Sequence, residues 1–359
     1  MPLDNTLESI LDLARWAPSG DNTQPWRFQI IDARHIVVHG FDTRDHCVYD
    51  LDGHPSQISL GALLESMALA ASARGMHMHA ARRLAMPDTQ PTFDIAFELA
   101  PQPADPLAAY IMQRSVQRRA LSTHALTAPE KSALAASLPD HYQVLWLEGL
   151  GKRMATARLM FNNAKLRLTM PEAHQVHSAV IEWNARFSED RIPDQALGVD
   201  PMTVKLMRWI MQSWRRVEFF NTYLAGTLVP RIQMDLIPGL ACAAHFVLVA
   251  DVRPRSIDDY VAAGRAMQRF WLTATQLGLQ VQPEMTPLIF ARYVREKRDF
   301  SKTSGMHERA AVLAAQCVRL IGEDNSERAV FMGRIGAGAP AAARSTRRAL
   351  KQLIVPHAA

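Results

Sequence analysis

The sequence predicts an α+β protein in which helices cover sheets. Short segments rich in Val, Ile and Phe, the composition of strands, are separated by long stretches whose apolar residues recur at helical spacing. Two of these helical stretches also resemble one another, which indicates two similar sheet-and-helix halves. Strands separated by long helices fold as a sheet with helices packed on it.

Seven segments have the length and composition of strands. They are, in chain order, Trp26–Ile31, His35–His39, Phe93–Leu99, Tyr142–Leu147, Phe246–Asp251, Cys317–Ile321 and Val330–Ile335. A further strand is predicted around His77 and His79, which alternate along the chain and are expected to be exposed on its surface.

The two similar helices form an internal repeat. Residues 61–76 align with residues 264–279, so that the glycines near both ends match, as do a leucine and an alanine between them. Small residues within both helices allow close packing, and each helix stops at a glycine followed by an apolar residue, as a C-terminal cap requires. Two unrelated buried helices of ordinary composition are the alternative.

The Pro-rich stretch at residues 100–106 is the natural joint between the halves, which we expect at residues 1–103 and 104–359. The second half carries an insertion at about residues 151–226 that we expect to be almost wholly helical. Its apolar side chains, Met207 and Trp209 among them, are expected to pack between helices, with a lid over a pocket as the alternative.

Composition narrows the function classes. The chain of 359 residues has no apolar run near the roughly 20 residues of a membrane span, and its first residues lack the pattern of a secretory signal. Its three cysteines are too far apart in sequence for metal-ligand spacing or a disulfide framework. We therefore expect a cytoplasmic protein with no membrane partner.

The net charge of +5 raises the question of nucleic acid. Zinc-finger spacing, an aromatic strand motif and a basic zipper are all missing, and small Arg clusters suit a phosphorylated small ligand equally well, so no nucleic-acid partner is expected. The His and Asp residues between positions 35 and 54 match no familiar metal site. His174 and His177 are expected in a helix–helix contact, with proton donation in a pocket as the alternative.

The most informative motif lies between the first predicted helix and the first predicted strand. Residues 18–22 read Pro-Ser-Gly-Asp-Asn, an irregular turn dense in hydrogen-bonding groups. Together with Gln24, the side chains of Ser19 and Asn22 offer donors and acceptors to a planar polar ligand. Spacing alone favours a simple capped loop.

Residues 18–26 resemble the Pro-Ser-x-x-Asn-x-Gln-Pro-Trp signature of the nitroreductase family, and every named position is present. In that family a homodimer builds two FMN sites at its interface, and one subunit gives this loop to the flavin. The resemblance implies a nitroreductase-like fold, FMN as the cofactor, and four cofactor-binding residues, Pro18, Ser19, Asn22 and Gln24.

The family's other motifs are found in the second half. Residues 114–118 resemble the Arg-Ser-x-Arg element that holds the FMN phosphate and ribityl chain, and one extra residue leaves Arg118 and Arg119 both open for the last position. Residues 280–285 resemble the loop whose backbone N–H groups approach the flavin N5 region. Residues 332–338 resemble the last strand, followed by a basic phosphate contact. The resemblance thus implies Arg114, Ser115, Arg118, Gln282, Pro283, Glu284, Arg344 and Arg347 as cofactor-binding residues.

The two halves are complementary, because the first lacks the Arg-Ser element and the second lacks the Pro-Ser loop. The resemblance therefore implies a fused, tandem branch of the family: a pseudo-dimer within one chain, with one FMN site and a monomeric state. Flavin hydride chemistry needs no protein nucleophile or metal, so no catalytic residue is assigned.

The implied activity is an FMN-dependent transfer of hydride or electrons between NAD(P)H, or another donor, and a small electron-poor or unsaturated organic molecule. The reverse reaction, a dehydrogenase that uses oxygen, fits the same residues. The alternatives are a protein that stores or sequesters FMN without turnover and a scaffold that has lost its flavin.

Overall fold

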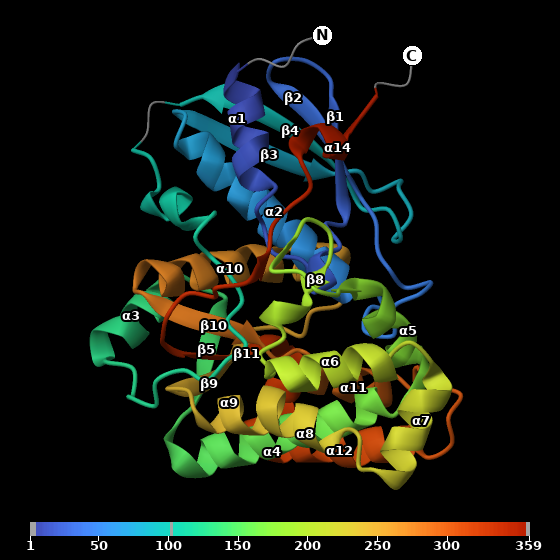
Figure 1. Cartoon of the computed structure of the whole chain (residues 1–359). Helices are drawn as coiled ribbons and strands as arrows, with labels where there is room; N and C mark the ends of the chain where they lie inside the picture. Colours follow the sequence, from blue (N-terminus) through green and yellow to red (C-terminus); the bar gives the residue numbers. More distant parts are fainter. Residues whose placement is uncertain (1–4, 101–102, 357–359) are drawn as a thin grey trace.

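The computed structural model describes residues 5–100 and 103–356, which form two sheets on either side of a pair of helices (Figure 1). Residues 1–4 of the N-terminus and residues 101 and 102 of the Pro-rich joint, both considered above, lie outside the described residues. The α+β fold class is confirmed, and six of the seven strands predicted from composition are present.

The first sheet has the strand order β13-β1-β2-β4-β3. Four antiparallel strands come from the first hundred residues: β1 (Trp26–Ile30), β2 (His35–Gly40), β3 (Met76–Arg82) and β4 (Thr92–Leu99). The fifth strand, β13 (Ile354–Val355), comes from the opposite end of the chain and pairs in parallel with β1. The first sheet is thus completed by residues far outside the predicted first half.

The second sheet is antiparallel, with the order β10-β11-β9-β5. It consists of β5 (Tyr142–Leu147), β9 (Ala244–Ala250), β10 (Leu279–Pro283) and β11 (Ala329–Ala337). Every residue of β9 is buried, as expected for an inner strand whose two faces are both covered.

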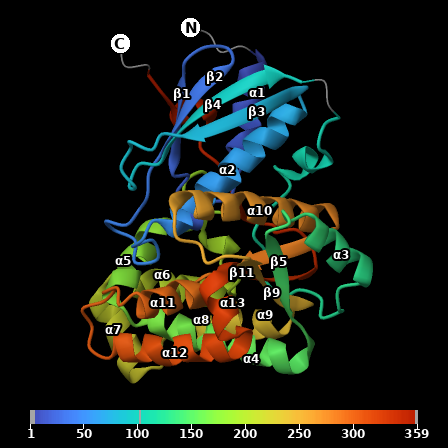
Figure 2. The same ribbon diagram turned by 180° about the vertical axis from the view of Figure 1, so that it is seen from behind.

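Helices α2 (His54–Ser72) and α10 (Ile257–Gln276) pack against each other between the two sheets (Figures 1 and 2). A Cβ atom placed on Gly61 would lie 2.0 Å from the carbonyl oxygen of Val261, and one placed on Gly264 would lie 2.0 Å from that of Ile58. The two helices therefore touch through equivalent positions of the predicted repeat. One hydrophobic core contains residues of both helices and both sheets.

Both helices also end as predicted. Each is followed by a glycine with a positive φ, 66° at Gly75 and 74° at Gly278, whose N–H donates to the carbonyl three residues earlier. That conformation closes a helix at little cost only in glycine.

The remaining helices surround this framework. They are α1 (Asn5–Ala14), α3 (Ala128–Ala136), α4 (Gly149–Leu168), α5 (Pro171–Val180), α6 (Pro201–Ile210), α7 (Trp214–Tyr223), α8 (Leu228–Arg231), α9 (Ile237–Leu240), α11 (Thr286–Arg295), α12 (Met306–Ile321), α13 (Glu323–Arg328) and α14 (Leu350–Leu353), with the 3₁₀ turns η1 (Gly20–Asn22), η2 (Pro106–Tyr110) and η3 (Asp194–Ala196) and the π-helical turn η4 (Ile232–Leu236).

Three local predictions are wrong. The strand predicted at residues 317–321 is the end of α12, because its apolar side chains continue a buried stripe at helical spacing that begins at Met306. The loop predicted at residues 280–285 is largely strand β10, in which Leu279 and Val281 are buried and their neighbours are less so. The first error followed from composition and the second from the family resemblance, and in both segments the spacing of the apolar residues indicates the structure that is observed.

The third wrong prediction is that the insertion is almost wholly helical. Residues 181–193 contain three two-residue strands, β6 (Ile181–Glu182), β7 (Phe187–Ser188) and β8 (Ile192–Pro193), and β7 pairs with β12 (Arg344–Ser345). The Asp194 carboxylate accepts two backbone N–H groups of this segment and so stabilises a turn in place of a helix.

Candidate functional site

The loop at residues 18–26 has a strained backbone. Asp21, Asn22 and Gln24 have φ values of 50°, 61° and 49°, and they are three of the six non-glycine residues with positive φ in the described part of the chain. Such conformations cost free energy in residues with a Cβ atom, and they concentrate where a protein holds a ligand or a close contact. Pro18, at the start of the loop, is buried.

Side chains inside the loop hold its shape. The Ser19 Oγ accepts the N–H of Gln24 at 3.0 Å. The Gln24 Nε2 donates to the carbonyls of Asn22 (3.1 Å) and Glu189 (2.8 Å), and its Oε1 accepts the N–H of Arg348 at 3.0 Å. Gln24 therefore joins the loop to the insertion and to the C-terminal segment.

Three of the predicted arginines gather beside this loop. The Arg114 Nη2 donates to the carbonyl of Trp16 at 3.3 Å, and the Arg347 Nε donates to that of Ala17 at 2.9 Å. The Arg344 Nη2 donates to the carbonyl of Arg114 at 3.3 Å. Segments more than 300 residues apart in sequence thus bring three guanidinium groups to the start of the Pro-Ser loop.

This arginine cluster (Arg114, Arg344 and Arg347) has no acidic partner in the described part of the chain. Every hydrogen bond that its guanidinium groups donate within the described residues goes to a backbone carbonyl. Burial lowers the pKa of Arg114 well below its usual range, and the neighbouring arginines lower it further; burial also lowers the pKa of Arg347 to about 9. Desolvated positive charges without a counter-charge favour the binding of an anion between them.

Residues 114–118 lie alongside strand β10. Val116 forms a parallel bridge with Val281, and the Gln117 N–H donates to the Val281 carbonyl at 3.1 Å. The predicted Arg-Ser element and the predicted ring segment, residues 282–284, are therefore neighbours. Ser115, Gln282 and Pro283 are all half-buried.

Of the two arginines left open by the sequence, Arg118 faces the interior. It donates to the Ala196 carbonyl at 3.3 Å, and burial lowers its pKa to about 10 against the opposing charge of Asp21. Arg119 is exposed. The arrangement favours Arg118 for a contact inside the site.

Glu284 lies in a buried network of charged groups. Its carboxylate accepts Nη1 of Arg334 at 3.0 Å and Nδ1 of His245 at 2.6 Å, and the Arg334 Nη2 donates to the Arg118 carbonyl at 2.8 Å. The backbone N–H of Glu284 donates to the Met332 carbonyl at 2.8 Å. Glu284 therefore fixes the end of β10 against β11 and supports the backbone of Arg118.

His245 completes the network and was missed by the sequence analysis. Burial lowers its pKa, but the Glu284 carboxylate outweighs burial and raises the pKa to about 10, so both ring nitrogens donate; the second donates to the Gly239 carbonyl at 2.8 Å. The signal that would have found it is its place as the one polar residue of the otherwise apolar strand β9.

A second polar group lies at the contact between the insertion and the loop before α2. His177, expected in a helix–helix contact, instead lies beside Tyr49 of that loop, and the sequence analysis missed the other members of the group. The Arg167 Nη2 lies 3.6 Å from Oδ1 of Asp235, and the Tyr49 hydroxyl and Nε2 of His177 are 3.0 Å apart. Burial raises the pKa of Asp235 to about 6. His174 makes the helix-to-helix contact expected of it, through Met211 O at 3.0 Å.

Several buried polar atoms around these groups have no hydrogen-bond partner within the described residues. They are Trp16 Nε1, Asn22 Oδ1, Arg114 Nε, Gln282 Oε1, Arg334 Nε and Arg344 Nε. Buried polar atoms are nearly always paired in folded proteins, so this set points to a ligand that accepts from the arginines and donates to the two amide oxygens. A ligand with an anionic phosphate, hydroxyl groups and a ring N–H satisfies that requirement.

Within residues 5–100 and 103–356, no helix combines the length and apolar character that a bilayer crossing requires. All three cysteines are unpaired and buried.

Residues 2–52 match the sequence model of the nitroreductase family. A curated relative, an uncharacterized protein of Mycobacterium tuberculosis (MT1398), is 24% identical over 306 residues, which are 83% of this chain. The chain spans 41% of that relative's length. The crystal structure of a nitroreductase-like family protein from Bacillus cereus superposes with a TM-score of 0.34 and 15% identity, covering 70% of this chain and 95% of that one. The match to the family's sequence model confirms the resemblance of residues 2–52, which contain the Pro-Ser loop, to the nitroreductase family.

Proposed function

We propose that this protein is an FMN-dependent oxidoreductase with one flavin site, assembled within a single chain. The observation that carries the proposal is the arginine cluster, which has no acidic partner within the described residues. Arg114 and Arg347 are buried and donate to the backbone at the start of the Pro-Ser loop, and Arg344 is half-buried. A phosphate monoester supplies the missing negative charge, and forked guanidinium groups match its oxygens.

In this proposal Arg114, Arg344 and Arg347 bind the phosphate, and Ser115 and Arg118 face the ribityl chain. Residues 282–284 lie at the ring, where Glu284 acts by holding the backbone. The Pro18–Trp26 loop closes the site from the other half, with Asn22 Oδ1 free to accept from the ligand. When bound, FMN supplies the hydride-accepting ring; the chain orients it, screens it from water and surrounds it with fixed donors.

The reciprocal contact of α2 and α10 supports the pseudo-dimer. In a two-fold interface residue i contacts j and its equivalent contacts i in return, and Gly61 and Gly264 meet equivalent carbonyls at the same 2.0 Å spacing. We propose two nitroreductase-like halves, residues 1–103 and 104–359, with the C-terminal strand β13 reaching back to the first sheet.

For the reaction we propose NAD(P)H or another hydride donor, and a small electron-poor or unsaturated organic acceptor. We further propose a monomer in the cytoplasm without nucleic-acid partners, because the interface that pairs two subunits elsewhere in the family is here internal.

One observation favours a second candidate, a flavin-storage protein without turnover. Residues 189 and 191 of the insertion bind Gln24 and Asn22 directly, so the insertion covers the Pro-Ser loop. Such a cover would hold flavin while denying access to a second substrate.

The absorbance spectrum of the purified protein tests whether the protein binds flavin. The substitution Arg344→Gln tests whether the arginine cluster binds the FMN phosphate. Each charge-assisted bond is worth about 1.5–3 kcal/mol, so the substitution should weaken FMN binding by roughly ten- to a hundredfold. Arg119→Gln, on the exposed neighbour, is the matched control and should leave flavin content unchanged. Equal flavin content in all three proteins would refute the phosphate assignment.

Anaerobic mixing with NADH or NADPH separates the two candidates. Bleaching of the flavin bands supports the oxidoreductase. Bleaching with dithionite alone, followed by no reoxidation with nitroaromatic or quinone acceptors, supports storage.

A further inference from the structure

Helices α6 and α7 expose an unusual amount of apolar surface. Nine of the eighteen large apolar side chains that are exposed in the described residues lie between positions 202 and 237, about a tenth of the chain. An apolar surface of this concentration marks a place where the protein contacts something other than water.

Helix α6 is apolar on two faces. Val204, Met207 and Met211 point inward, packing with the residues around Ile181 and Leu197. On the opposite face, Met202, Leu206 and Trp209 recur at i, i+4 and i+7 and are between 48% and 81% exposed. Packing within the protein explains the inner face and leaves the outer one without a partner.

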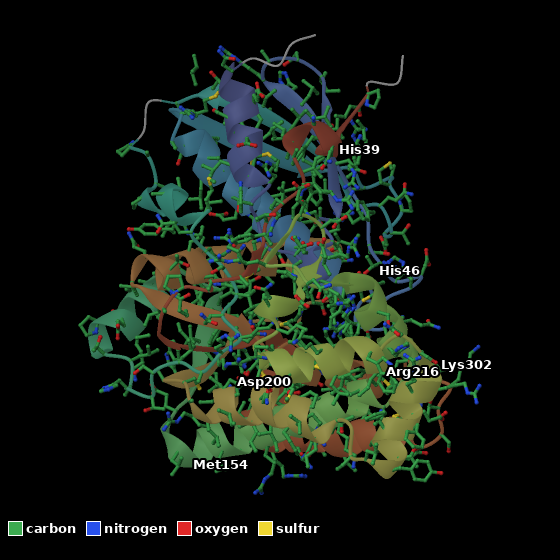
Figure 3. The ribbon with its side chains drawn as sticks, viewed as in Figure 1. His39, His46, Met154, Asp200, Arg216 and Lys302 are labelled. Atoms are coloured by element: carbon green, nitrogen blue, oxygen red, sulfur yellow. The ribbon has the colours of Figure 1, made fainter. Side chains whose placement is uncertain are left out.

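The outer face of α7 continues this surface. The Trp209 ring meets Phe220 edge-on with centroids 5.8 Å apart, and Phe219 stands 6.0 Å from Phe220 and 5.2 Å from Tyr223. The aromatic rings thus run from one helix to the next without a break. We define the α6–α7 surface by its exposed members, Met202, Leu206, Trp209, Phe219 and Tyr223. The two helices can be found in Figure 3 by the labels of Asp200, which precedes α6, and Arg216, which lies on α7.

The charges around the α6–α7 surface are mostly positive. Residues 200–223 contain four basic side chains and two acidic ones, Glu218 and Asp200, and the Asp200 carboxylate accepts hydrogen bonds from Thr203 and Gln233. Arg216 lies over the Trp209 ring, with its Cζ 4.5 Å from the ring centroid. Lys205 and Arg215, both exposed, have no ion-pair or hydrogen-bond partner among the described residues. They are free to meet negative charge outside the protein.

We propose that the α6–α7 surface docks the protein on an anionic lipid bilayer, with its aromatic rings at the headgroup level. Trp, Tyr and Phe with flanking Lys and Arg are the composition of helices that lie in a membrane interface, whereas protein–protein interfaces are depleted in Lys. No spanning helix is needed for this mode, so the expectation of no membrane partner, which rested on the absence of a span, does not extend to it.

Cosedimentation of the full chain with vesicles tests the proposal. We expect binding to phosphatidylcholine vesicles that contain about 30% phosphatidylglycerol, weaker binding to phosphatidylcholine alone, and a loss of binding as salt screens the charges. Trp209→Ser combined with Phe219→Ser should abolish binding. Lys205→Ser combined with Arg215→Ser should weaken it about thirtyfold, at about fivefold per basic residue.

Leu84→Ser combined with Val252→Ser is the matched control, because these two apolar side chains are even more exposed but lie in turns outside α6 and α7. Circular dichroism confirms that each variant is folded. Unchanged vesicle binding of the Trp209 and Phe219 variant would overturn the proposal. So would a lipid-free dimer, seen by light scattering, that this variant converts to monomer, since the surface would then serve a second copy of the chain.

Discussion

At the scale of single residues, the carboxylate of Glu284 organises the interior of the candidate site. Its two oxygens accept hydrogen bonds from Arg334 and His245, and all three side chains are at most 3% exposed. Glu284→Gln would leave two buried cations without their counter-charge. We expect the free energy of unfolding to fall by about 3–5 kcal/mol, measured by urea denaturation.

The control for that substitution is Asp94→Asn, which breaks the ion pair with Arg83 on the surface. Both partners are more than 40% exposed, so the change should cost no more than about 1 kcal/mol. Equal losses for the two variants would mean that the buried network contributes no more than a surface pair.

His245 makes the stability of the protein depend on pH. Its pKa in the folded state, about 10, is above its ordinary value of 6.5, so its stabilising contribution is complete below about pH 6.5 and is lost as the pH rises through 10. We expect the urea midpoint to decline between these pH values. His245→Asn should remove most of this decline, whereas His79→Asn, an exposed control, should leave it in place.

At the scale of elements, the contact between α2 and α10 depends on two glycines. A methyl group at Gly61 or Gly264 would collide with a backbone carbonyl of the facing helix, which cannot rotate away. Gly61→Ala and Gly264→Ala should each reduce the free energy of unfolding by about 3 kcal/mol or more, and by similar amounts if the interface is two-fold.

Gly151→Ala is the control for these glycines. Gly151 lies in α4 with open space where a Cβ atom would stand, so alanine should stabilise the protein by about 0.5–1 kcal/mol. A clear inequality between the Gly61 and Gly264 variants would count against the pseudo-dimer.

The C-terminal strand is the element that closes the first sheet. Leu353, just before β13, is completely buried, although more than 320 residues separate it from β1, the strand that β13 pairs with. Leu353→Ala should cost about 2–5 kcal/mol in thermal or urea unfolding. Leu99→Ala, at the exposed end of β4, should be nearly neutral; a similar loss for both would show that β13 adds nothing to the sheet.

At the scale of the whole molecule, the proposal of one complementary pair of half-sites predicts how many FMN molecules each chain binds. Native mass spectrometry should find one FMN for each 40.1 kDa chain, and light scattering should find a monomer in the absence of lipid. Two flavins on one chain would require a second arginine cluster and a second Pro-Ser loop, and would refute the asymmetric site.

The sequence by itself determined the α+β class, six strands, the C-terminal ends of the two central helices and the position of the Pro-Ser loop. These features are local: side-chain alternation, helical spacing, a capping glycine, and a run of residues 18–26 whose identities match a family. It also identified the arginines and the segment at residues 282–284 by resemblance, and their part in binding FMN remains a prediction.

Only the tertiary structure decided which of these residues meet. The sequence could not place Arg347 beside Ala17, because contacts between residues hundreds of positions apart follow from how helices and sheets pack, and no local pattern encodes them. The role of His245 could not be predicted for the same reason. Its neighbours along β9 predict that it is buried, but its partner Glu284 comes from a distant segment, directly after β10. Local physics fixes the elements of this protein, and packing between distant segments fixes its charged interior.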